Sequence, residues 1–129
     1  MSTLYTRGNA ILALTPAATM VGKEGYGCTI SGDTATISAS GTTIATGIIL
    51  EGAATTGKAS VGIIGALGGP VRVCLGGTVT KGAALVQHTD GSWITDPATG
   101  ARVKSWIALE SGVSGQLIEA ANLTPVTLS

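Results

Sequence analysis

The segment Gly52-Ala53-Ala54-Thr55-Thr56-Gly57-Lys58 comes nearest in this chain to a motif that carries chemistry, because it matches the first seven positions of the phosphate-binding P-loop pattern. Phosphate binding would also require a hydroxyl directly after the lysine and a helix whose N-terminus faces the nucleotide. Position 59 is alanine, Ser60 comes one place late, and the residues that follow favour a strand. We therefore predict a hairpin loop at residues 52–58 and no nucleotide site.

His88, Asp90 and Ser92 hold the three side-chain types of a hydrolytic relay within five residues. Such a relay needs the base and its orienting carboxylate on opposite sides of one imidazole, which alternate residues on a strand and a turn do not provide. Asp90-Gly91 is a favourable turn dipeptide, and a lone histidine without a partner at ligand spacing is a poor metal candidate. The pattern predicts a turn and no catalytic, cofactor or metal site.

Carboxylates at Glu51, Glu110 and Glu119 could in principle form an acid–base pair of the kind that hydrolyses sugars. A sugar-cleaving enzyme would normally add aromatic platforms and a long cleft, and this chain has two Trp, two Tyr and no Phe. Trp93 and Trp106 are better interpreted as large core or interface anchors, because aromatic side chains dominate contact energetics.

Lys81 lies in a Thr-Val-Thr-Lys-Gly segment that is similar to half of a lipoyl- or biotinyl-carrier motif. Carrier domains place the modified lysine at a hairpin tip, usually after methionine, whereas Lys81 follows Thr80 and precedes the glycine turn. A carrier-like or enzymatic barrel therefore stays as an alternative hypothesis, and an intact-mass measurement would reveal an adduct on Lys81.

The elements that would position these residues are short strands. The chain has 129 residues, which predicts one domain, and 20 glycines, 44% hydrophobic residues and 11% charged residues. Apolar residues alternate with threonine and serine, as in Thr34-Ala35-Thr36-Ile37-Ser38, and turn residues recur at intervals typical of all-β folds. We predict an all-β, small single-domain β-barrel or sandwich of about nine or ten short strands, with no long helix. One helical turn is expected at residues 17–20, and the core candidates in the segment from Thr42 to Leu50 are Ile44, Ile48, Ile49 and Leu50.

Seven basic and seven acidic residues are scattered along the chain and give a formal net charge of zero. Nucleic-acid binding needs clustered cations, so we expect no nucleic-acid partner. No apolar run approaches the length of a membrane span, and no secretory signal is expected. Cys28 and Cys74 lie in apolar segments; they could form a disulfide, although a cytoplasmic location favours two buried thiols.

Composition also predicts three parts. Residues 1–7 lack a burial pattern and form an extended N-terminal arm, residues 8–121 form the β-domain, and residues 122–129 form a polar C-terminal tail. The arm and the tail are expected to become ordered only on docking, by adding a strand to a neighbouring sheet edge.

Four segments, in this order, resemble the bacteriophage head decoration (capsid cement) proteins. They are similar to the opening strand of that family, to its central strand, to its glycine turn and to its closing hairpin, and they are Gly8–Ala18, Gly47–Gly52, Leu75–Gly82, and Trp106–Gly112 with Gly115–Glu119. The stretch from Gly32 to Ser40 departs from the family pattern as an added hairpin.

The resemblance implies a non-enzymatic virion protein without a cofactor that binds the exterior of the capsid after assembly in the host cytoplasm. Its implied partners are the major capsid protein and further copies of itself in a homotrimer, with no nucleic acid and no membrane. The resemblance carries over no individual contact residue. From the sequence itself, contacts with the capsid or between copies are expected at Leu4, Tyr5, Arg7, Trp93, Trp106 and Pro125. The alternative function is a small phage tail or fibre component whose β-domain binds the host or another tail protein.

Overall fold

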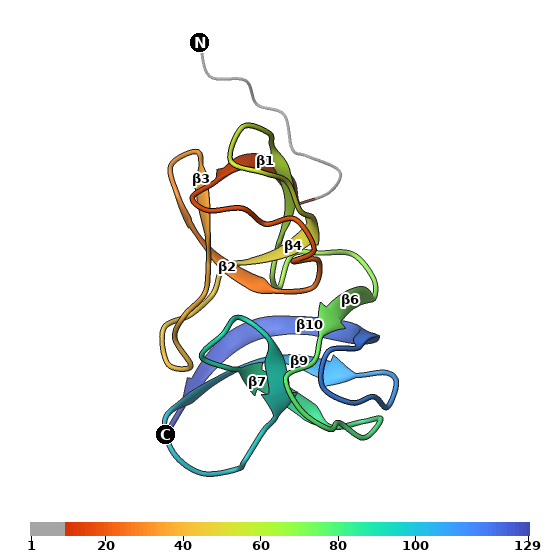
Figure 1. The fold of residues 1–129 in the computed structure, drawn as a ribbon. Helices are drawn as coiled ribbons and strands as arrows, with labels where there is room; N and C mark the ends of the chain where they lie inside the picture. The colour runs from red at the N-terminus through yellow and green to blue at the C-terminus, as the bar shows by residue number, and fades with distance from the viewer. Residues whose placement is uncertain (1–9) are drawn as a thin grey trace.

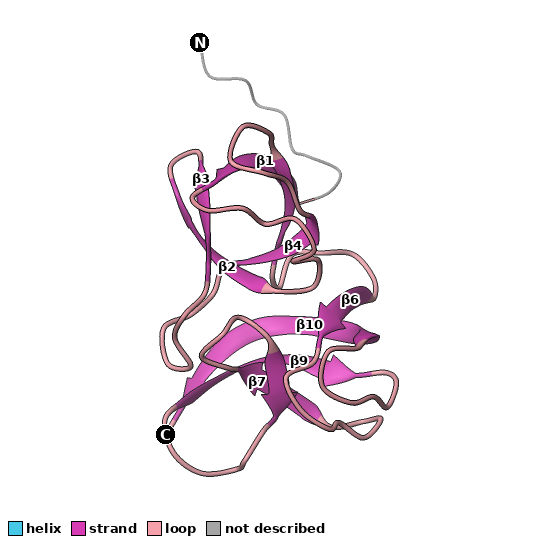
Figure 2. Ribbon diagram, in the orientation of Figure 1, coloured by secondary structure: helices cyan, strands magenta, loops and turns pink. Residues whose placement is uncertain are grey.

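The computed structural model describes residues 10–129, which form ten strands and contain no helix. The strands make two modules, a closed barrel at the top of Figure 1 and a curled sheet below it. The predicted all-β fold with about ten short strands is confirmed, and Figure 2 shows loops alone between the strands. The strands are β1 (Ile11–Pro16), β2 (Gly27–Ser31), β3 (Thr34–Ile37), β4 (Gly47–Glu51), β5 (Ala59–Ile63), β6 (Val71–Cys74), β7 (Ala84–Gln87), β8 (Trp93–Thr95), β9 (Arg102–Ala108) and β10 (Leu117–Leu128).

The barrel has the strand order β1-β3-β2-β4-β5 and closes where β1 pairs in parallel with β3 and antiparallel with β5. The hairpin expected from the alternating segment is present, because β2 and β3 pair antiparallel around Gly32-Asp33 and Gly32 adopts a φ of +57°. Side chains directed inward from all five strands and from Met20 fill this barrel, as period-2 alternation requires. The expected helical turn at residues 17–20 is wrong, since these residues form a bend and irregular chain.

The second sheet has the order β6-β10-β9-β7-β8 and curls until its two ends meet. Leu75, which follows β6, bridges in parallel to Trp93 of β8, and the Gly76 amide donates to the Trp93 carbonyl at 2.8 Å. The sheet therefore wraps around its own contents and encloses two tryptophans.

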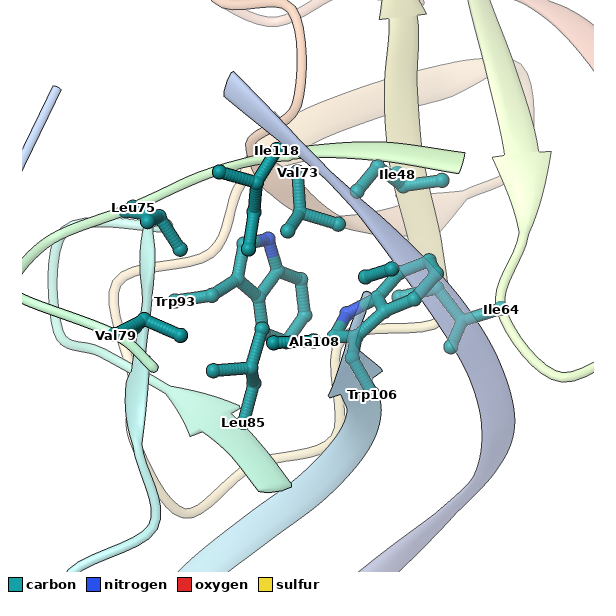
Figure 3. Packing of buried hydrophobic residues seen from close by; sticks show 11 residues of the cluster. Ile48, Ile64, Val73, Leu75, Val79, Leu85, Trp93, Trp106, Ala108 and Ile118 are labelled. Carbon is teal, nitrogen blue, oxygen red and sulfur yellow. The ribbon is translucent and has the colours of Figure 1, made fainter. Parts of the chain in front are cut away.

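Trp93 and Trp106 form the centre of the larger core. Their rings meet edge to face, with centroids 5.6 Å apart and planes at 78°, and both side chains are fully buried. Figure 3 shows Ile48 and Ile64 from the barrel side of the molecule beside this pair, so the core crosses from one module to the other. Aromatic pairs in this geometry add stabilisation beyond the area they bury.

Gly25 joins the modules through three hydrogen bonds. Its carbonyl accepts the indole N–H of Trp93 at 3.0 Å and the backbone N–H of Cys74 at 3.0 Å, and its own amide donates to the Ile49 carbonyl at 2.8 Å. Gly25 has a φ of +83°, and a Cβ built on it would lie 2.6 Å from the Cys74 nitrogen. The close approach of the two modules therefore depends on the absence of a side chain at this position.

A strap of residues 38–46 runs from the barrel down one side of the curled sheet and is held there by Gln87. The Gln87 amide accepts from the Ala45 N–H at 2.7 Å and donates to the carbonyls of Ser40, at 3.1 Å, and Thr43, at 2.7 Å. Ile44, an expected core residue, lies on the outside of this strap and is 39% exposed. Every polar group of the buried amide is thus used in holding the strap.

The expectation that the C-terminal tail becomes ordered only on docking is wrong. Residues 122–128 continue β10, and Val126, Thr127 and Leu128 pair with β9 after a bulge. The Asn122 side chain fixes this region by accepting from the Gly65 amide at 3.0 Å and donating to the Leu67 carbonyl at 3.0 Å. The polar composition of the tail reflects a strand that has one face exposed to solvent. The expected arm at residues 1–7 lies outside the described residues.

Substitution of Gly25 tests the junction, and Gly22 provides a matched control. Both glycines have a φ near +80°, but a Cβ at Gly22 would meet nothing within 4 Å. We expect Gly22→Ala to cost about 1–2 kcal/mol through backbone strain, and Gly25→Ala about 3–5 kcal/mol because overlap is added. Urea denaturation of both variants measures the difference, and equal losses would contradict the role of Gly25.

Substitution of Gln87 tests the strap. Gln87→Met keeps the side-chain length but leaves the buried Ala45 N–H without its acceptor and the Thr43 carbonyl without its donor, while the Ser40 carbonyl keeps the donor at the Ser38 hydroxyl. We expect a loss of about 2–4 kcal/mol in the free energy of unfolding, since unsatisfied buried groups lose their full solvation. Gln116→Met is the control, because the Gln116 side chain is exposed and its oxygen accepts one hydrogen bond, from the Val113 N–H. The loss in this variant should stay below about 1 kcal/mol. A similar loss in the two variants would show that the strap does not depend on Gln87.

Candidate functional site

The segment that matches a P-loop is a hairpin loop. Residues 52–58 join β4 to β5, and the strand β5 begins at Ala59, where nucleotide binding would need a helix. The Lys58 ammonium donates to the Thr15 hydroxyl at 2.7 Å on the barrel surface. The prediction of a hairpin loop at this position is confirmed.

His88, Asp90 and Ser92 form the turn between β7 and β8. The Ser92 hydroxyl and the Ser92 amide both donate to Asp90 Oδ1, and the His88 amide donates to the Ser92 carbonyl at 3.0 Å. Because the serine proton points to the aspartate, the imidazole does not receive it and no nucleophile is activated. The prediction of a turn is confirmed, and Gly91 supplies the positive φ of +89° that this turn needs.

The two turn aspartates of the lower sheet both have a lowered pKa. Burial of the Asp90 carboxyl raises its pKa, but hydrogen bonds from the Ser92 hydroxyl and amide outweigh this and hold the pKa below its ordinary value. Burial also raises the pKa of Asp96, but the Ala98 amide and the paired Arg102 guanidinium outweigh this and hold the pKa below its ordinary value. These carboxylates stabilise turns in their charged form.

The remaining candidate groups do not converge. Glu51 ends β4 in the barrel, while Glu110 and Glu119 lie together in the curled sheet, where Glu110 Oε1 accepts from the Glu119 amide at 2.8 Å. Lys81 is exposed, and its backbone amide donates to the Ser111 hydroxyl at 2.9 Å. Within residues 10–129 no group of three or more His, Cys, Asp or Glu side chains could hold a metal ion, and no pocket is present. The same residues contain no helix with the length and apolarity of a membrane span.

Both cysteines are free and buried. Burial raises the pKa of the Cys28 thiol to about 12, and burial is also the main cause of the raised pKa of Cys74. The thiolate is the nucleophilic form of cysteine, so both residues act as small apolar side chains in the packing.

The six expected contact residues have different outcomes. Leu4, Tyr5 and Arg7 lie outside the described residues. Trp93 and Trp106 are fully buried and therefore anchor the core, as one of the two interpretations had it, and present no surface to a capsid or a second copy. Pro125 is half-buried in β10 beside the Gly65 turn, and its role as a contact stays a prediction.

Strand edges within residues 10–129 are largely occupied. The barrel is closed, the end of the curled sheet at β8 is bridged to Leu75, and the Cys74 amide beside the other end is bonded to Gly25. The turn at Gly65 lies against residues 123–125 of β10, since a Cβ built on Gly65 would be 3.2–3.4 Å from their backbone and ring atoms. Little free edge therefore remains at β10 for the strand addition that was expected of the tail.

One exposed apolar cluster occupies the closing hairpin between β9 and β10. Leu109, Val113 and Leu117 are 36%, 52% and 44% exposed, and we call these three side chains the hairpin face. The Leu109 amide donates to the Glu119 carbonyl, and the Gln116 amide donates to the Val113 carbonyl. Leu117 lies beside the junction of the modules, because a Cβ built on Gly25 would be 2.6 Å from its Cδ2 atom. Sequence reasoning missed this cluster, although the alternation of Leu117 with the buried Ile118 could have indicated that Leu117 points outward.

Comparison with known proteins gives a fold relationship. No family model matches the chain, and no curated protein matches its sequence. Among solved structures, the head fiber gp8.5 N base in bacteriophage phi29 is similar, with a TM-score of 0.60 and 19% sequence identity over 88% of this chain and 92% of that chain. The two chains therefore share a fold over almost their full lengths.

The turn carboxylates predict a specific dependence of stability on pH. A carboxyl whose pKa is lower in the folded state adds stability that is present above the unfolded value of about 3.9 and is lost as the pH falls through the folded value. We expect the difference in unfolding free energy between the wild-type protein and Asp90→Asn to be constant from pH 7 to about 5 and to shrink toward pH 2. Urea titrations across this range measure this difference. The unfolding free energy of Ser92→Ala, which keeps the carboxyl but removes one donor, should lie between those of the wild-type protein and Asp90→Asn. An unchanged difference down to pH 2 would contradict the assignment.

Proposed function

We propose that this chain is a structural protein of a phage virion that attaches to the outside of the head. The observation that carries the proposal is the fold shared with a phage head fiber base over 88% of this chain. The order of the four segments that resemble capsid decoration proteins supports the same location independently of the coordinates. The proposed partner is the major capsid protein, with attachment after assembly in the host cytoplasm.

The physical properties of the molecule suit a passive attachment role. A core that crosses both modules and a strap held by a buried amide make the two modules one body. The surface carries few charges and many small polar side chains, which suit broad and hydrated contacts. Repeated copies on a lattice would multiply modest contacts, because attachment at several points raises the effective concentration of each contact.

Two forms of this role make different demands. A cement protein bridges neighbouring capsid subunits and adds interface that must be lost before the shell opens. A fibre base needs only to hold one site on the head and to carry another segment outward, and the description of the structural neighbour as a head fiber base favours this second form. The homotrimer implied by the decoration resemblance is compatible with either form and is proposed on that resemblance alone.

Binding to capsids tests the proposed function. Purified protein is mixed with expanded, DNA-free capsids of the phage that encodes it, and bound copies are counted after sedimentation and located by electron cryomicroscopy. We expect saturable binding to the outer surface, while the unfolded or strongly destabilised Gly25→Ala protein should not bind. No binding to expanded capsids, or density in the tail alone, would contradict the proposal.

The same particles separate cement from fibre base. A cement protein should raise the temperature at which capsids open, because its bridging contacts must break first, and should occupy most equivalent lattice sites. A fibre base should occupy a subset of sites and leave the opening temperature unchanged. Differential scanning fluorimetry of bare and saturated capsids measures the first property, and copy counting measures the second.

A further inference from the structure

The turn between β7 and β8 contains the one Asp-Gly pair of the sequence, Asp90-Gly91. In such a pair the backbone nitrogen of glycine can attack the aspartate side chain, because glycine has no Cβ to shield it. The Gly91 nitrogen would form a bond to Asp90 Cγ, and the carboxyl hydroxyl would leave with the amide proton as water. Hydrolysis of this succinimide at the Asp90 backbone carbonyl takes the water up again and leaves isoaspartate, in which the main chain runs through the side chain.

Hydrogen bonds hold both reacting groups in the folded turn. Asp90 Oδ1 accepts from the Ser92 hydroxyl and from the Ser92 amide, and the Gly91 amide donates to the His88 carbonyl at 3.4 Å. Burial raises the pKa of Asp90, but the bonds from Ser92 outweigh this and lower it, so the carboxyl is ionised at neutral pH. An ionised carboxyl lacks the hydroxyl that must leave. Attack by the Gly91 nitrogen therefore requires that the bonds from Ser92 break first.

Packing against the barrel fixes the same peptide unit. The Gly91 carbonyl accepts the Gly27 N–H at 2.8 Å. A Cβ built on Gly91 would lie 2.7 Å from Ile37 Cγ2 and 3.1 Å from Tyr26 Cδ2. The Gly91 nitrogen cannot swing toward the Asp90 side chain without loosening this contact between the modules, and the extra backbone methylene of isoaspartate would lengthen the turn at the same place.

We propose that Asp90 is a site of spontaneous isoaspartate formation and that Ser92 sets the rate by holding the carboxylate in the closed turn. The rate follows the population of the opened turn, because the closed form does not react. The product affects more than the turn, since Trp93 comes directly after Ser92 and its indole N–H bonds to the Gly25 carbonyl. The reaction needs water alone and does not depend on the virion role, although a particle that is not renewed after assembly would accumulate the product.

Incubation of the purified full chain at neutral pH over several weeks, followed by peptide mapping with mass spectrometry, measures the conversion at Asp90. We expect slow conversion in the wild-type protein and conversion about tenfold faster in Ser92→Ala, because a hydrogen bond to a charged group no longer holds the turn closed. Asp90→Glu should give no signal, since its side chain would have to close a larger ring. Urea denaturation confirms that the variants are folded.

Gly82→Ala is the control for lowered stability. Gly82 has a φ of +92° in the turn at the other end of β7, and a Cβ there would meet nothing within 4 Å. This variant strains the same sheet but keeps the bonds between Ser92 and Asp90, so the conversion rate should stay at the wild-type value.

The unfolded chain supplies the reference rate. In concentrated guanidinium chloride the wild-type protein and Ser92→Ala should convert equally fast, because the Asp-Gly pair is the same and no turn protects it. Equal rates of the two folded proteins, an equal acceleration by Gly82→Ala, or a folded wild-type protein that converts as fast as the unfolded chain would overturn the proposal.

Discussion

The closeness of the two modules at Gly25 is the constraint on which the rest of this structure depends. One carbonyl oxygen receives a tryptophan N–H from the curled sheet and a backbone N–H from the residue beside Leu75, while the same residue donates to the barrel through Ile49. A carbonyl has two lone pairs, so both donors can be satisfied at once. The positive φ and the missing Cβ make this arrangement possible for glycine and costly for other residues.

Consequences of this junction extend into the core. Fixing the indole of Trp93 orients it for the edge-to-face contact with Trp106, and the pair is then covered by aliphatic side chains of both modules. The Trp106 indole N–H and the Ser105 hydroxyl are buried without a partner among the described residues, whereas the Trp93 indole N–H has one. The two tryptophans thus differ in role: one connects the modules, and the other fills the space between them.

The side chains that could have done chemistry are used to build turns. Asp90 and Asp96 accept backbone and side-chain hydrogen bonds within their own loops, Lys58 holds the barrel surface at Thr15, and Glu110 caps the start of β10. Recognition is therefore left to surfaces, and with most strand edges occupied these surfaces are sheet faces and loops. Turns fixed in this way keep the shape of the molecule, which suits the attachment role proposed above.

Local sequence determined the elements of this protein whose causes are local. Period-2 alternation and the Gly32-Asp33 turn predicted the β2–β3 hairpin, Asp90-Gly91 predicted the β7–β8 turn, and the missing hydroxyl at position 59 predicted a loop where a phosphate site would be. Tertiary structure decided which apolar residues are inside. The sequence does not show whether Trp93 and Ile44 are buried or exposed, because their burial depends on the curl of the sheet and on the path of the strap that Gln87 holds. Residues 122–128 became a strand through pairing with β9, and Leu117 became exposed through its register with β6, since strand pairing joins residues that are distant along the chain and leaves little trace in either segment alone.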